Sequence, residues 1–179
     1  MKSIAPLAVS LLSAFTVHAN DLDVWSGPSP DKAFLAAERR IPDADMVQRL
    51  DLDGTRVVIS SLDRSGTIGS VYASHEFARR LVTQIRWSPD SKFHLFTTSS
   101  SGGHSPWHFE TYVFSISDRT FRVMDDLVGP ITDPKLEFTP PDIVILKVRD
   151  YSHEYGEPGD SKQVRVRLSE VVRKMRVDE

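Results

Sequence analysis

The segment Trp87-Ser88-Pro89-Asp90-Ser91-Lys92-Phe93-His94-Leu95-Phe96-Thr97-Thr98 joins a turn to a strand. Ser88-Pro89-Asp90 is typical of a turn, because proline fixes φ while serine and aspartate side chains hydrogen-bond to nearby backbone groups. Residues 93–98 are rich in aromatic and β-branched side chains, which favour strands. The segment therefore predicts a protein in which short β-strands follow proline-containing turns.

Other segments extend this pattern along the chain. Residues 109–116 have a strand composition, and Ser117-Asp118-Arg119 predicts a tight turn before a returning strand at 120–124. Residues 143–148 are apolar at nearly every position, which predicts a central strand covered on both faces. Asp53-Gly54 predicts a hairpin turn between residues 48–52 and 55–60.

The C-terminal region combines a strand with a helix. Residues 163–168 alternate between apolar and basic side chains, which predicts a strand with one face in water. Apolar residues at helical spacing around Ser169 predict a short C-terminal helix. Together these segments predict an all-β fold of antiparallel sheets, in a partial-propeller or sandwich arrangement, with that short helix at the end.

The turn-and-strand pattern recurs along the chain. Copies start near residues 29, 88 and 139, and the first, Ser29-Pro30-Asp31-Lys32-Ala33-Phe34, matches the second most closely. The third, Phe138-Thr139-Pro140-Pro141-Asp142, is the weakest. A repeat of this kind predicts similar supersecondary units placed one after another.

Residues 87–92 and the strand after them resemble the repeat of the TolB-type, WD40-like β-propellers, Trp-Ser-Pro-Asp-Gly-Lys followed by a strand. The resemblance covers roughly residues 85–124, with Ser91 in place of the glycine. It implies blade-like strands and extracytoplasmic binding, and it implies no catalytic residues. A closed propeller needs at least four blades of about 40–50 residues. The copies start 59 and 51 residues apart, so the 160 residues from 20 to 179 hold only about three such units. A single β-rich domain over residues 20–179 is therefore expected.

The N-terminal region has the pattern of a signal peptide. Lys2 precedes an apolar run from Ile4 to Val17, and Val17-His18-Ala19 supplies suitable residues before a cleavage site. The run is too short for a membrane-spanning helix, which needs about 20 residues. We therefore expect residues 1–19 to be removed, and the mature protein to be periplasmic or secreted without a membrane span.

Composition excludes several classes of function. The chain contains 22 basic and 25 acidic residues, for a net charge of -3, and this mild acidity argues against nucleic-acid binding. It contains no cysteine, which excludes disulfides, thiolate metal sites, cysteine nucleophiles and a lipidated N-terminal cysteine. Gly-x-Ser-x-Gly, phosphate-loop and dinucleotide motifs are also absent.

The connection between the strands predicted at 93–98 and 109–116 is the candidate binding site. Its glycines allow a close approach to the backbone, its tryptophan offers apolar area, and its histidines offer hydrogen bonds. We expect a non-catalytic module that binds a small ligand or an envelope protein through this loop. A homodimer in which two copies pair at their sheet edges is a further alternative. The predicted contact residues are Ser101, Gly102, Gly103, His104, Trp107 and His108.

The alternative prediction is a divalent-metal site, with zinc the natural ion. His104, His108 and Glu110 could supply nitrogen and oxygen ligands, and His153 could complete the set. Such a site would indicate a metal-binding protein or a hydrolase with a metal-activated water. The spacing matches no established zinc motif, and otherwise no cofactor is expected.

Overall fold

The computed structural model describes residues 23–41, 54–77, 80–100, 108–150 and 160–175. Within them the strands form three antiparallel sheets. The first contains, in order, β1 (Asp23–Pro28), β2 (Phe34–Ile41), β3 (Gly54–Leu62) and β4 (Ile68–Ala73). The second contains β5 (Arg80–Trp87), β6 (Phe93–Ser100), β7 (Glu110–Ser115) and β8 (Thr120–Val123). The third contains β9 (Glu137–Thr139), β10 (Ile143–Arg149) and β11 (Ser161–Arg167).

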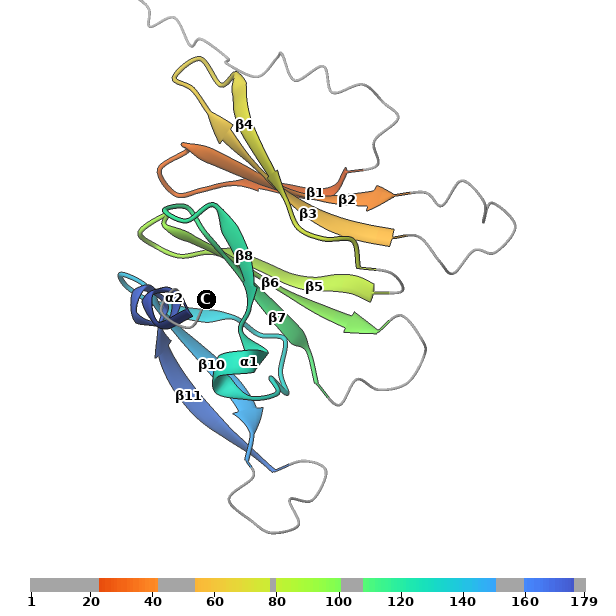
Figure 1. Cartoon of the computed structure of the whole chain (residues 1–179), viewed down its shortest axis with the longest axis vertical. Helices are drawn as coiled ribbons and strands as arrows, with labels where there is room; N and C mark the ends of the chain where they lie inside the picture. Colours follow the sequence, from red (N-terminus) through yellow and green to blue (C-terminus); the bar gives the residue numbers. More distant parts are fainter. Residues whose placement is uncertain (1–22, 42–53, 78–79, 101–107, 151–159, 176–179) are drawn as a thin grey trace, which may run out of the picture.

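Each sheet is a meander in which consecutive strands lie side by side, and the three sheets are stacked in chain order (Figure 1). A short helix, α1 (Asp125–Val128), connects the second sheet to the third, and α2 (Leu168–Met175) follows β11. The all-β prediction with a short C-terminal helix is therefore confirmed. The stack fits both predicted arrangements, a sandwich or a partial propeller.

The middle sheet is covered on both faces. Phe93 and Leu95 of β6 belong to one apolar cluster, together with Val144 of β10. Phe96 belongs to a second cluster, with Ile59 of β3. Because side chains alternate along a strand, β6 contributes to the core on both sides.

The prediction that residues 143–148 form a central strand is confirmed for the third sheet, whereas the prediction that both faces of this strand are covered is wrong. These residues form the central strand of the third sheet, and Val144, Leu146 and Val148 are buried. Ile143 and Ile145 are only half-buried and Lys147 is exposed, because among the described residues no further sheet covers this outer face.

The hairpin predicted at Asp53-Gly54 is also wrong. β3 begins at Gly54, which pairs with Ile41, and β3 lies between β2 and β4. The partner of β3 is thus residues 34–41 rather than 48–52, which lie outside the described residues. Dipeptide turn chemistry did not identify the partner strand.

The three copies of the repeat occupy equivalent places, since each lies between the first and second strands of its sheet. The first two have the same hydrogen bonds. Ser29 Oγ donates to Asp31 Oδ1 at 2.6 Å and accepts from the Phe34 N–H at 3.0 Å. Ser88 Oγ donates to Asp90 Oδ1 at 2.7 Å and accepts from the Phe93 N–H at 3.0 Å.

The two turns also contact each other. The Asp31 N–H donates to Ser91 Oγ at 3.0 Å, and Trp87 Nε1 donates to the Gly27 carbonyl oxygen at 3.2 Å. Lys32 and Ser91 hold equivalent positions with a φ of 61°, in the left-handed region that favours glycine. The repeated turn thereby joins the first two sheets at one end.

Removing the turn hydroxyls is expected to destabilise the fold. Ser29 and Ser88 are both buried, so their replacement by alanine removes the acceptor of the Phe34 or Phe93 N–H and one of the hydrogen bonds to the aspartate. We expect Ser29→Ala and Ser88→Ala each to lower the free energy of unfolding by about 1–3 kcal/mol. Denaturant unfolding measures this change. Ser65→Ala, in an exposed turn, is the matched control, and equal losses in all three variants would contradict the prediction.

Candidate functional site

The loop predicted to bind a partner connects β6 to β7. Of its candidate residues, Ser101, Gly102, Gly103, His104 and Trp107 lie outside the described residues, as does His153. Their predicted roles stay predictions. The structure describes the remaining two: Glu110 is the first residue of β7, and His108 lies two residues before it.

Glu110 is held in a polar cluster at this end of the second sheet. Its Oε2 lies 2.7 Å from Arg80 Nη1, which also donates to Thr98 Oγ1 at 3.0 Å. Burial, together with the charge and hydrogen bond of Glu110, raises the pKa of Tyr112 well above its usual range. Glu110 therefore links the edge strand β5 to β6 and β7.

His108 lies near a different carboxylate, that of Asp125. Burial raises the pKa of Asp125, against the N–H groups of Thr111 and Ile131 and the neighbouring His108, which favour its ionised form. Asp125 Oδ2 accepts the Thr111 N–H at 2.7 Å and Oδ1 accepts the Ile131 N–H at 3.3 Å, so Asp125 connects β7 to the segment after α1.

The predicted metal site has no support in the described part of the chain. β7 begins at Glu110, so the strand does not extend back to His108 as a shared face with Glu110 would require. No group of three or more histidine, aspartate or glutamate side chains among the described residues is arranged to hold a metal ion. Since His104 and His153 are not described, the complete set stays untested.

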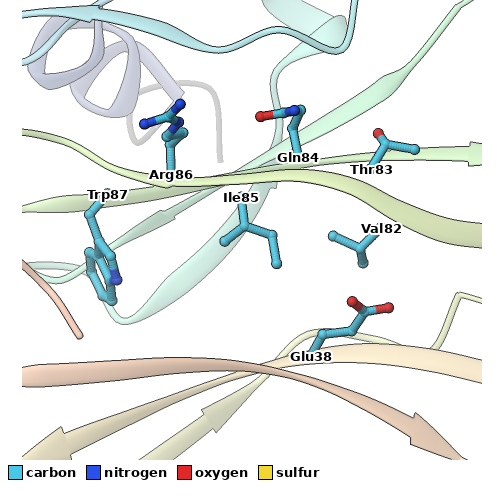
Figure 2. A pocket seen from close by; sticks show the side chains of 7 residues that line it. All are labelled: Glu38, Val82, Thr83, Gln84, Ile85, Arg86 and Trp87. Carbon is cyan, nitrogen blue, oxygen red and sulfur yellow. The ribbon is translucent and has the colours of Figure 1, made fainter. Parts of the chain in front are cut away.

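A hollow lies between the first two sheets. It is a cleft of about 510 Å³ between β2 and β5 (Figure 2). We call it the inter-sheet cleft, and its lining residues are Glu38, Val82, Thr83, Gln84, Ile85, Arg86 and Trp87. None of these residues is among the site residues predicted from the sequence.

An irregularity in β5 shapes the inter-sheet cleft. The register with β6 shifts between Val82 and Gln84, as at a β-bulge. Val82, Ile85 and Trp87 consequently point toward β2 (Figure 2). Thr83, Gln84 and Arg86 point to the other side of β5, so the lining residues lie on both sides of this strand (Figure 2).

Glu38 provides the acidic group of the cleft. It lies on β2, two residues after the buried Ala36, and its carboxylate points toward Val82 (Figure 2). Only 6% of Glu38 is exposed. Glu38 already takes part in an interaction within the protein, and its carboxylate adds an acidic group to the lining of the cleft.

Trp87 forms a fixed wall of the cleft. Its indole N–H donates to the Gly27 carbonyl oxygen, and its ring centroid lies 6.4 Å from that of Phe34 and 4.7 Å from that of His94. These contacts come from both sheets. The apolar side of the cleft is therefore held in position by the core rather than by a loop.

The backbone edge of β5 is open beside the cleft. In the described part of the second sheet, β5 is the end strand and pairs only with β6. Leu81 of this strand is 46% exposed. An end strand offers unpaired N–H and C=O groups that a further strand could join.

Comparisons of the chain with protein-family models, curated proteins and solved structures gave no match. None of the described helices is long and apolar enough to cross a membrane.

Proposed function

We propose that the protein is a non-catalytic binding module that takes an extended polypeptide segment along the open edge of β5. The observation that carries this proposal is the lining of the inter-sheet cleft, which runs on both sides of that strand. Export by the predicted signal peptide would place this module in the periplasm or outside the cell, and this is part of the same proposal.

An extended peptide matches such a lining because its side chains alternate between two directions. One set would enter the apolar side beside Val82, Ile85 and Trp87, while the other set would lie near Thr83 and Arg86. Main-chain hydrogen bonds to a sheet edge give affinity, and pockets for alternate side chains give specificity. A compact small molecule would use only one of the two sides.

Glu38 would determine which peptide side chains are preferred on the apolar side of the cleft. A lysine or arginine of the peptide can place its aliphatic stem along Ile85 and its charged end at the Glu38 carboxylate. We therefore expect a preferred peptide to combine apolar residues with one basic residue in the same alternating phase.

The proposal is tested by selecting from a library of random peptides about eight residues long, the length of β5. The wild-type chain should enrich alternating sequences with a basic residue. Glu38→Gln keeps the shape and removes the charge, so it should weaken the enriched peptides by at least about tenfold in equilibrium binding assays.

Leu81→Ala provides the matched control, because Leu81 is exposed on the same strand but does not line the cleft. It should leave the affinity unchanged, whereas Ile85→Ala should reduce it. Circular dichroism and unfolding curves establish that each variant is folded. Selection of no peptide, or equal binding by wild type, Glu38→Gln and Ile85→Ala, would contradict the proposal.

A further inference from the structure

The third sheet has one strand fewer than the other two in the part of the chain that the structure describes. The repeated turn lies between the first and second strands of every sheet, so β9, β10 and β11 correspond to the first three strands of the four-stranded sheets. The place of a fourth strand is beside β11, which is the end strand of its sheet (Figure 1).

The chain turns away from this place when β11 ends. The Leu168 N–H donates to the Asp142 carbonyl oxygen, and the Ser169 N–H donates to Asp142 Oδ2, both at 3.0 Å. These bonds hold the start of α2 at the third copy of the turn. Leu168 and Val172 of α2 are buried in the core, so residues 168–175 form a helix instead of a returning strand.

Positive charge surrounds the open edge of β11. Register with β10 places Arg165 opposite Ile145 and Arg167 opposite Ile143 on the outer face. Lys147 of β10 lies on the same face. Neither Arg165 nor Lys147 has an ion pair among the described residues, and all three basic side chains are exposed.

Acidic groups near these residues offset little of this charge. Arg167 lies 3.5 Å from Glu170, but both side chains are about half exposed, and exposed pairs of this kind stabilise weakly. Glu137 of β9 pairs with Lys135. The outer face beside β11 is thus basic in a chain whose net charge is -3.

A hollow continues across this outer face. It has a volume of about 380 Å³ and extends from β11 across β10 to β9. Its lining residues are Asp133, Lys135, Glu137, Ile145, Leu146, Lys147, Ser161 and Gln163. Ser161 and Gln163 of β11 therefore border open space, whereas Arg165 and Arg167 lie further along the same strand.

We propose that β11 binds an extended acidic segment of a partner protein, which completes the third sheet as its fourth strand. Acidic side chains of the segment would lie beside Arg165 and Arg167, because neighbouring strands place side chains of one face about 4.5–5.5 Å apart. Side chains of the opposite phase would face inward beside Val164, which packs partly buried against the core. This site is separate from the inter-sheet cleft and does not depend on the function proposed for it.

A second copy of the chain fits this edge poorly. Two β11 strands paired with each other would bring the arginines of both copies onto the same face, with no acid on either strand to offset them. Like charges across a strand pair are destabilising. The charge complementarity therefore selects an acidic partner over self-pairing.

The test uses a seven-residue peptide, the length of β11, in which glutamate alternates with valine. A second peptide has the same sequence but carries N-methyl groups on alternate residues, which removes the N–H donors of one edge without changing charge. The full chain should bind the first peptide, and N-methylation should weaken binding by at least about tenfold in calorimetry or fluorescence anisotropy.

Protein variants locate the site. The double variant Arg165→Glu, Arg167→Glu should abolish binding of the acidic peptide and gain binding of the matching lysine–valine peptide. Arg64→Glu, an exposed arginine in the turn before β4, is the control and should bind the acidic peptide like the wild type. Both substitutions in β11 are at exposed positions, so the fold should be retained.

Three outcomes would overturn the proposal. Equal binding of both peptides would show electrostatic attraction without strand pairing. Binding of a sulfated polysaccharide or of anionic lipid vesicles, but not of the peptide, would assign the basic face to another class of partner. No binding of any of these would mean that the basic side chains serve only to keep a bare edge from pairing.

Discussion

Phe96→Ala is expected to lower the free energy of unfolding by about 3–5 kcal/mol, the usual cost of deleting a buried phenylalanine ring. Phe96 is fully buried at the centre of the middle sheet. Its ring is stacked on that of Tyr112 at 5.0 Å between centroids and meets Phe77 edge-on at 5.7 Å. The substitution would therefore open a cavity between the first and second sheets.

Denaturant unfolding followed by tryptophan fluorescence measures this loss. Phe138→Ala is the matched control, because Phe138 lies on β9 and is only partly buried against the other apolar cluster. Phe138→Ala should lower the free energy of unfolding clearly less than Phe96→Ala does. A loss in Phe96→Ala no larger than that in Phe138→Ala would mean that contacts between the first two sheets contribute little to stability.

The sequence predicted the class of fold and the position of the Ser-Pro-Asp turns, although not the hairpin at Asp53-Gly54. Ser-Pro-Asp turns are local features, since their hydrogen bonds join residues no more than five apart, and the copies at residues 29 and 88 do form the same turn. The strand at 163–168 and the C-terminal helix were also readable from short-range alternation and spacing.

Such local patterns did not predict which of the three sheets lies in the middle of the stack. Residues 143–148 are more apolar than residues 93–98, yet the second segment is the one covered on both faces. β6 buries polar side chains because they find partners there. Thr97 Oγ1 lies 2.8 Å from Thr83 Oγ1, and Thr98 Oγ1 accepts from Arg80. Such partners come from other strands, so local hydrophobicity underestimates burial.

The inter-sheet cleft could not be predicted for a related reason. Its acidic residue, Glu38, is on β2, and its apolar wall is on β5 in the next sheet. The wall also depends on the register shift after Val82, and no pattern in the sequence predicts this shift. The ion pair of Glu110 with Arg80 also joins two strands that are far apart in the sequence, so the sequence did not indicate it.

His94 is expected to make the protein markedly less stable in acid. Its side chain is fully buried between the Trp87 and Phe96 rings, at centroid distances of 4.7 Å and 6.2 Å. Burial lowers the pKa of His94 from 6.5 to about 3. Between these pH values the unfolded chain binds a proton at this histidine that the folded protein does not bind, so acidification favours unfolding.

In that interval, protonation of His94 in the unfolded chain lowers the free energy of unfolding by about 1.4 kcal/mol for each unit of pH. Between pH 6.5 and pH 4, His94 alone should remove about 3 kcal/mol of the free energy of unfolding. His94→Phe retains a ring of similar volume and cannot be protonated, so its stability should fall less steeply over this range. Carboxylates titrate in both proteins, and the difference between their pH profiles isolates the histidine.

The control for this comparison is His75→Gln, which removes an exposed histidine instead of the buried one. Urea unfolding at intervals from pH 7 to pH 4 gives the three profiles. We expect the free energy of unfolding of the wild type and of His75→Gln to fall in parallel from pH 7 to pH 4. That of His94→Phe should fall by about 3 kcal/mol less over the same range. Parallel profiles for all three proteins would show that His94 is protonated in the folded state, and hence that its burial does not exclude charge.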